Sequence, residues 1–134
     1  MAGYSEMPLA KKLGIKPGTK AFFHSPPESV LAELKPALTD VELARALSSE
    51  LDFILSFVRS KSELTKDFPV WKKHLSKYGC LWIAWPKKTS GLASTLSDTI
   101  VRDVGLKESL VDIKVCAIDE QWSGLKFVYR KGDR

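Results

Sequence analysis

An apolar run that ends at a proline is the feature that most constrains this chain. Residues 78–86, Tyr-Gly-Cys-Leu-Trp-Ile-Ala-Trp-Pro, carry no charge and lead into a cationic, hydroxyl-rich segment, residues 87–91. A strand that is apolar on both faces is typical of the interior of a parallel sheet covered by helices on both sides. Ligands of such open sheets bind beyond the carboxyl ends of the strands. The run therefore predicts an α/β fold and a candidate binding site at residues 87–91.

The rest of the chain supplies further strands and helices. Strands are expected at residues 19–24 and 51–58, with an edge strand at 41–47 that fits a helical turn equally well. Helices are expected at 28–34, from the capping box of Ser60 and Glu63 onward with a kink or break at Pro69, and from Ser97 to Gly105. The second helix has a regular apolar stripe, with Gly79 as its C-terminal cap; the stripe consists of Leu64, Phe68, Trp71, Leu75 and Tyr78. Residues 112–118 and 125–130 form a hairpin.

This order of elements predicts a small doubly wound, Rossmann-like three-layer sandwich, with a mostly parallel sheet and a C-terminal antiparallel hairpin. In the first hairpin strand, Ile113 and Val115 alternate with Lys114, the pattern of a half-buried strand. With 134 residues the chain predicts a single domain, residues 1–134, in which residues 1–18 form an N-terminal extension packed on the rest.

Composition limits the classes of function. No apolar run approaches the ~20 residues of a membrane span, and residues 1–12 lack a signal-peptide core, so we expect a cytoplasmic protein without membrane contact. Cys80 and Cys116 lie in separate strands without metal or redox spacing and are expected to be buried free thiols. With only His24 and His74 as histidines, no metal site is expected. No nucleophile motif occurs, and no catalytic residue is predicted.

The charge is unevenly distributed. The net charge is +5, and residues 71–134 hold twelve basic and seven acidic side chains. A basic half attracts phosphates or nucleic acid, but here the lysines are scattered and no aromatic-interleaved strand motif accompanies them. A nucleic acid is therefore an unfavoured partner.

The candidate site follows from the expected sheet order: second, first, third and fourth strand, with the hairpin at the far edge. The topological switch then lies between the first and third strands. One cleft would gather an imidazole, a guanidinium, ammonium groups and hydroxyls, a set that suits a phosphate, a carboxylate or a nucleotide. The predicted ligand-binding residues are His24, Ser25, Arg59, Ser60, Trp85, Lys87, Lys88, Thr89, Ser90 and Gly91. Trp122, in the hairpin turn, either folds back over the cleft or marks a surface for a protein partner.

Residues 3–130 resemble a family of small bacterial proteins of unknown function. The matching segments are Gly3-Tyr4-Ser5, residues 9–15 (Leu-Ala-Lys-Lys-Leu-Gly-Ile), 57–60 (Phe-Val-Arg-Ser), 85–91 (Trp-Pro-Lys-Lys-Thr-Ser-Gly), 115–120 (Val-Cys-Ala-Ile-Asp-Glu) and 122–125 (Trp-Ser-Gly-Leu). The order of elements also resembles a shortened core of the S-adenosylmethionine-dependent methyltransferases. These resemblances imply the fold; the family of small proteins carries no activity to transfer.

Two departures from working methyltransferases decide the functional hypothesis. Their first strand runs into a glycine-rich turn, whereas residues 23–28 here hold no glycine and two prolines, which is expected to close the nucleotide cradle. Residues 46–48 also lack the acidic side chain that holds ribose hydroxyls. The leading hypothesis is therefore a non-catalytic domain without a cofactor that binds a small anionic metabolite or a protein partner. The alternatives are a methyltransferase with a degenerate cofactor motif and a weak nucleic-acid-binding protein.

Overall fold

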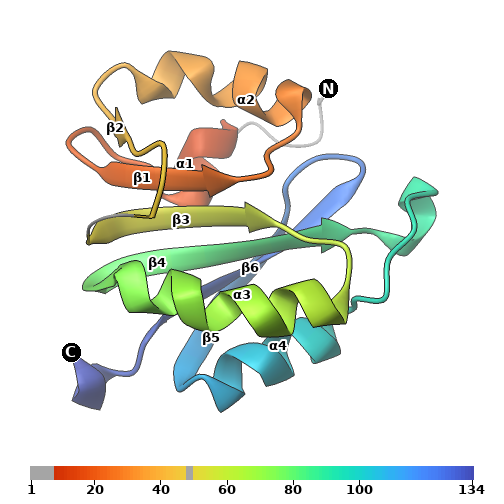
Figure 1. Ribbon diagram of the computed structural model, residues 1–134. Coiled ribbons are helices and arrows are strands. Elements are labelled where there is room, and N and C mark those ends of the chain that lie inside the picture. Colours follow the sequence, from red (N-terminus) through yellow and green to blue (C-terminus); the bar gives the residue numbers. More distant parts are fainter. Residues whose placement is uncertain (1–7, 48–49) are drawn as a thin grey trace.

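A six-stranded sheet runs through the centre of the molecule with two helices on each face (Figure 1). The structure, a computed structural model, describes residues 8–47 and 50–134. The strands are β1 (Lys20–His24), β2 (Glu42–Leu43), β3 (Leu51–Phe57), β4 (Leu75–Pro86), β5 (Leu110–Ala117) and β6 (Trp122–Tyr129). The helices are α1 (Leu9–Leu13), α2 (Glu28–Leu34), α3 (Lys61–His74) and α4 (Asp98–Lys107), with 3-10 turns at Lys35–Leu38, Lys88–Ser90 and Lys131–Asp133.

The sheet has the order β2-β1-β3-β4-β6-β5, as the sequence predicts. The first four of these strands pair in parallel, and β6 pairs antiparallel with both β4 and β5. The order reverses between β1 and β3, so the predicted switch point is confirmed. Within the described residues, no helix combines the length and apolar character that crossing a bilayer requires.

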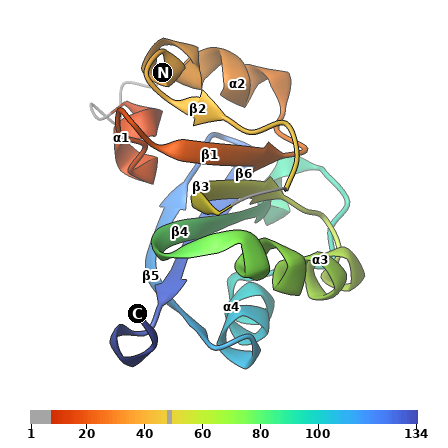
Figure 2. The ribbon, with the colours of Figure 1, turned by 60° about the vertical axis from the view of Figure 1, so that its left-hand side comes forward.

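Two hydrophobic clusters fill the space on either side of the sheet. α1 and α2 cover one face and α3 and α4 the other (Figures 1 and 2). Successive side chains of a strand point to opposite faces of the sheet. The two tryptophans of β4 therefore lie in different clusters: Trp82 packs on the α1/α2 side and Trp85 on the α3/α4 side. The three-layer sandwich is confirmed.

From residue 8 onward, the N-terminal segment contributes apolar side chains to one of the two clusters. Leu9, Leu13 and Ile15 are buried in the cluster beneath α1 and α2. The motif Gly3-Tyr4-Ser5 and the rest of residues 1–7 lie outside the described residues, as does position 48 of the stretch after β2.

The boundary between α3 and β4 differs from the prediction. α3 ends at His74, and Leu75 already pairs with Leu51 as the first residue of β4. Tyr78 is 84% exposed on that strand. Gly79 is no helix cap: a Cβ at this position would lie 2.7 Å from the carbonyl oxygen of Asp52. Pairing with β3 therefore ends the helix at His74, so the last two residues of the apolar stripe, Leu75 and Tyr78, belong to β4.

Three smaller predictions need correction. α3 continues without a break across Pro69, which is exposed. The edge strand β2 is two residues long. In β5, Ile113 and Val115 are 57% and 60% exposed, because β5 lies at the edge of the sheet and its register with β6 shifts between Asp112 and Lys114. Apolar alternation alone does not distinguish an edge strand from an inner one.

Candidate functional site

A cavity of about 410 Å³ opens at the carboxyl ends of β1 and β3. This is the switch point of the sheet, where open α/β folds bind ligands. Its lining comes from five parts of the chain: the exit of β1, the exit of β3, the first turn of α3, the loop after β4 and the turn between β5 and β6. The lining residues are Ser25, Pro27, Phe57, Arg59, Glu63, Leu92, Gln121 and Trp122.

The exit of β3 is held by backbone hydrogen bonds to neighbouring segments. The Val58 amide donates to the Ala84 carbonyl at 2.9 Å, which extends the pairing with β4 past the end of the strand. The Arg59 carbonyl accepts from the Thr95 amide at 3.0 Å, and the Thr95 hydroxyl accepts from the Lys61 amide at 2.9 Å. The backbone that carries Arg59 into the cavity is therefore tied to the loop before α4.

The predicted capping box at the start of α3 is confirmed in part. The Ser60 hydroxyl accepts a hydrogen bond from the Glu63 amide at 3.2 Å. The Glu63 carboxylate accepts from the Arg59 amide, one residue before the cap, at 3.4 Å. Ser60 thus acts as the helix cap, and Glu63 is turned toward the cavity that it lines.

The turn after β1 takes a conformation that normally calls for glycine. Ser25 has a φ of 51°, in the left-handed region of backbone conformation that residues other than Gly, Asn and Asp rarely adopt. Ser25 and Pro27 both line the cavity. The expectation that the two prolines close the nucleotide cradle is therefore wrong: the chain makes the turn through Ser25 and leaves the space open.

An aromatic pair forms the wall opposite that turn. The rings of Phe57 and Trp122 meet edge to face, with centroids 5.0 Å apart and an interplanar angle of 82°. Trp122 is only 5% exposed, so it folds over the cavity and offers little surface to a partner. The Asp119 carboxylate fixes this turn by accepting from the amides of Gln121 and Trp122, each at 2.8 Å.

The loop after β4 contributes less than the sequence predicts. Its lining residue is Leu92, and residues 87–91 are not part of the cavity wall. The Ser90 hydroxyl donates to the Lys87 carbonyl at 2.7 Å and accepts from the Leu92 amide at 3.0 Å. Gly91, with a φ of 79°, ends the 3-10 turn. Lys88 and Thr89 are exposed on this turn, so Lys87 to Gly91 shape the loop beside the cavity.

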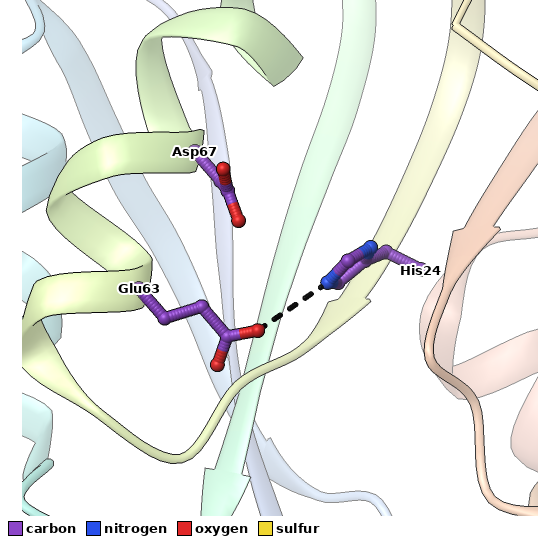
Figure 3. Close-up of side chains that lie close together, drawn as sticks. All are labelled: His24, Glu63 and Asp67. Carbon is purple, nitrogen blue, oxygen red and sulfur yellow. Dashed lines mark ion pairs between the residues drawn. The ribbon is translucent and has the colours of Figure 1, made fainter.

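Of the remaining predicted residues, Trp85 is buried in the core beside α3 and α4 and does not reach the cavity wall. His24 lies next to the site and contacts it through Glu63. Its Nε2 atom is 3.6 Å from Glu63 Oε2 (Figure 3). Its ring packs on Trp71, with ring centroids 5.1 Å apart. Ser25, Arg59 and Trp122 are thus the predicted residues that line one cavity.

Sequence reasoning missed Phe57, Glu63, Leu92 and Gln121 as parts of the site. Phe57 ends a buried strand, and its position at the strand exit is the signal that would have found it. Glu63 was identified only as half of a capping box. The Gln121 carbonyl accepts a hydrogen bond from the Lys87 amide at 2.8 Å, and this bond joins the hairpin turn to the end of β4.

The cavity wall offers three kinds of group that can recognise a ligand. Its aromatic wall suits a flat ring or a positively charged centre. The exposed Arg59 guanidinium can hold a carboxylate or a phosphate through paired hydrogen bonds. The Glu63 carboxylate can accept hydrogen bonds from hydroxyl or amino groups. Ligand sites of folded proteins commonly have volumes of about 300–1,000 Å³, and this cavity falls in that range.

Solved structures show which known fold this arrangement matches. No protein-family model and no curated protein sequence matches the chain. A methyltransferase from Aquifex aeolicus matches with a TM-score of 0.62 and 15% identity, over 89% of this chain and 86% of that one. The magnesium protoporphyrin IX methyltransferase of Synechocystis with bound S-adenosylhomocysteine matches with a TM-score of 0.61 and 9% identity, over 91% and 78%.

A third match is the ribosomal protein L11 methylase of Lactobacillus delbrueckii subsp. bulgaricus, with a TM-score of 0.57 and 14% identity over 91% of this chain and 75% of that one. At such identities the likeness concerns the fold. The chain has a Rossmann-like domain with the core architecture of the S-adenosylmethionine-dependent methyltransferases.

Proposed function

We propose that this protein binds S-adenosylmethionine in the cavity at the exits of β1 and β3 and acts as a small methyltransferase. The observation that carries the proposal is the open cavity at the switch point, where the sequence suggested a closed one. The likeness of the fold to methyltransferases supports the same assignment. This proposal replaces the hypothesis of a non-catalytic binding domain as the leading hypothesis.

The residues of the cavity fit this cofactor in three respects. Ser25 provides the left-handed turn that glycine provides in a nucleotide cradle. Phe57 and Trp122 present aromatic surface suited to an adenine ring or a sulfonium centre. Arg59 suits the carboxylate of the amino-acid part.

Two features differ from the usual cradle. Pro26 and Pro27 donate no backbone hydrogen bonds, so side chains of the cavity wall have to replace them. Glu63 is the carboxylate that the wall offers to hydroxyl groups, in place of an acidic residue after β2. When bound, the cofactor supplies an activated methyl group, and its transfer to a nucleophile leaves S-adenosylhomocysteine.

Isothermal titration calorimetry with S-adenosylmethionine and S-adenosylhomocysteine tests this proposal. We expect both to bind, and Arg59→Ala to weaken binding by about tenfold or more, the worth of one charge-assisted hydrogen bond. Arg130→Ala removes an exposed arginine at the end of β6 and is the matched control, with unchanged affinity expected. Absence of heat with both compounds would overturn the proposal.

Methyl transfer needs its own measurement. Radiolabelled S-adenosylmethionine is incubated with the protein and a bacterial extract, and incorporation of label into protein, nucleic acid and small-molecule fractions is compared with that of Arg59→Ala. Label that enters one fraction only with the parent protein supports transfer. Binding without incorporation in any fraction would count against catalysis.

A second candidate function is the binding of a phosphorylated nucleotide without catalysis. The exposed Arg59 side chain on the cavity wall favours it, because a guanidinium binds a phosphate through paired hydrogen bonds. Adenosine monophosphate in the same calorimetric experiment separates the two candidates. Heat with the nucleotide and none with either adenosyl compound would favour this second function.

A further inference from the structure

Three side chains capable of binding a metal ion meet beside the cavity. His24 comes from the end of β1, and Glu63 and Asp67 come from successive turns of α3 (Figure 3). One possible ligand atom from each residue lies within 4.8 Å of the other two. Residues four positions apart share one face of a helix, which is why both carboxylates are directed toward the imidazole. The cluster thus joins two elements that are distant in the sequence.

The imidazole nitrogen in this cluster has no hydrogen-bond partner among residues 8–47 and 50–134. His24 Nε2 is buried as an atom, and its 3.6 Å separation from Glu63 Oε2 is too long for a hydrogen bond. Ser56, the register partner of His24 on β3, has a fully buried hydroxyl that likewise lacks a partner among the described residues. Because buried polar atoms are nearly always paired, the unpaired His24 Nε2, which belongs to the cluster, points to a partner such as a metal ion.

The charge of the cluster favours a cation. Glu63 and Asp67 are like charges at helix positions i and i+4, an arrangement that destabilises a helix when nothing neutralises it. Within the part of the chain that the structure describes, no lysine or arginine side-chain nitrogen lies within 4.0 Å of either carboxylate. The one basic group close to them is the imidazole itself, and a metal ion needs that imidazole neutral.

We propose that His24, Glu63 and Asp67 bind a divalent transition-metal ion of the Zn²⁺ or Mn²⁺ class. One nitrogen and two carboxylate oxygens suit these ions, whereas Mg²⁺ prefers oxygen ligands alone. Ligand atoms around a tetrahedral Zn²⁺ ion are about 3.4 Å apart, so the cluster has to contract. The Glu63 side chain, 38% exposed, has the freedom to do so, while the ring of His24 is held against Trp71.

Three protein ligands leave at least one coordination position open. Because Glu63 also lines the cavity, that position adjoins the space in which a ligand would lie. The metal site does not depend on the proposed cofactor, since its three residues meet in the folded protein alone. Its test therefore uses metal ions without any nucleoside.

Calorimetric titration of the chelator-treated protein with ZnCl₂, MnCl₂ and MgCl₂ is the first experiment. We expect one binding site for Zn²⁺ or Mn²⁺ and much weaker binding of Mg²⁺. Asp67→Asn and Glu63→Gln keep the side-chain volumes, and each should weaken binding by at least about tenfold. Glu33→Gln, an exposed glutamate on α2, is the matched control and should leave the affinity unchanged.

Thermal unfolding shows whether a variant that fails to bind metal is still folded. The parent protein should gain thermal stability with excess Zn²⁺ or Mn²⁺, because a ligand that binds only the folded state stabilises it. Asp67→Asn removes the like-charge pair, so its melting temperature should equal or slightly exceed that of the metal-free parent, and the gain with metal should be lost. The proposal is overturned if no ion binds at about millimolar concentration, or if the two site variants bind as tightly as Glu33→Gln.

Discussion

The indole nitrogen of Trp82 donates a buried hydrogen bond of 2.8 Å to the carbonyl oxygen of Leu13. The two residues are 69 positions apart, and the bond joins the central strand β4 to the last residue of α1. Carbonyl groups in the last turn of a helix have no partner within the helix. Trp82 supplies one, which explains how a helix of five residues is held firmly on the sheet.

Replacing Trp82 with Phe should lower the free energy of unfolding by roughly 2–4 kcal/mol. The variant leaves the buried Leu13 carbonyl unpaired and removes part of a fully buried ring. Urea denaturation measures the change. Trp85→Phe is the matched control, since this buried tryptophan donates no side-chain hydrogen bond within the described residues. Equal losses in both variants would show that the hydrogen bond contributes little.

Gly105→Ala should destabilise the protein although alanine is the better helix former. A Cβ at this position would clash with Cε1 of the fully buried Phe127 ring. Overpacking of this kind costs about 1–3 kcal/mol, which exceeds the roughly 1 kcal/mol gained in helix propensity. Gly132→Ala meets no atom within 4 Å and serves as the control. A Gly105→Ala melting temperature at or above that of the parent would contradict the prediction.

Substitutions at Ser25 should separate backbone strain from side-chain chemistry. Ser25→Gly relieves a positive φ but adds freedom to the unfolded chain, so stability should change by less than about 0.5 kcal/mol. Ser25→Val places a β-branched residue in the same conformation and should cost about 1–3 kcal/mol. Chemical denaturation of both variants measures the difference. Equal stabilities would show that the turn relaxes around the larger residue.

Stability should fall in alkaline solution through Cys80. Burial raises the pKa of its thiol from 9.0 to about 11, against a smaller opposite effect of Lys126. Below pH 9 the thiol keeps its proton in both the folded and unfolded states. Between about pH 9 and 11 only the folded state keeps it, so unfolding becomes more favourable as the pH rises, and the loss is complete above the folded-state pKa. Cys80→Ala should show a shallower decline in urea denaturation over that interval; identical slopes would contradict the assignment.

The inner strands β3 and β4 were predictable because residues on both of their faces are buried. Runs such as residues 51–57 and 80–86 leave no alternative to an inner strand, and their order determined the switch point. Edges were not predictable in the same way. Ile113 looks apolar and inward-facing in the sequence, yet it lies on the exposed edge strand β5. Its exposure depends on which strands flank it, and the local pattern carries no such information.

The candidate site was predictable in position but less so in composition. Arg59 and Ser25 followed from the rule that ligands bind at strand exits. The role of Glu63 was hidden, because a capping glutamate and a cavity-lining glutamate have the same sequence pattern. Lys87 and Lys88 suggested a phosphate site by their charge, but they lie at the start of a 3-10 turn that is not part of the cavity wall, to which this loop contributes Leu92. Only the three-dimensional path of that loop separates these outcomes.

The cavity walls are drawn from positions as far apart as 25 and 122, with residues of three other segments between them. No short segment of the chain contains the complete binding surface. Occupancy by any compound should consequently protect the whole sheet at once, so that amide hydrogens in β1 and in the β5–β6 turn slow their exchange together. Binding at this cavity should therefore be coupled to the stability of the sheet as a whole.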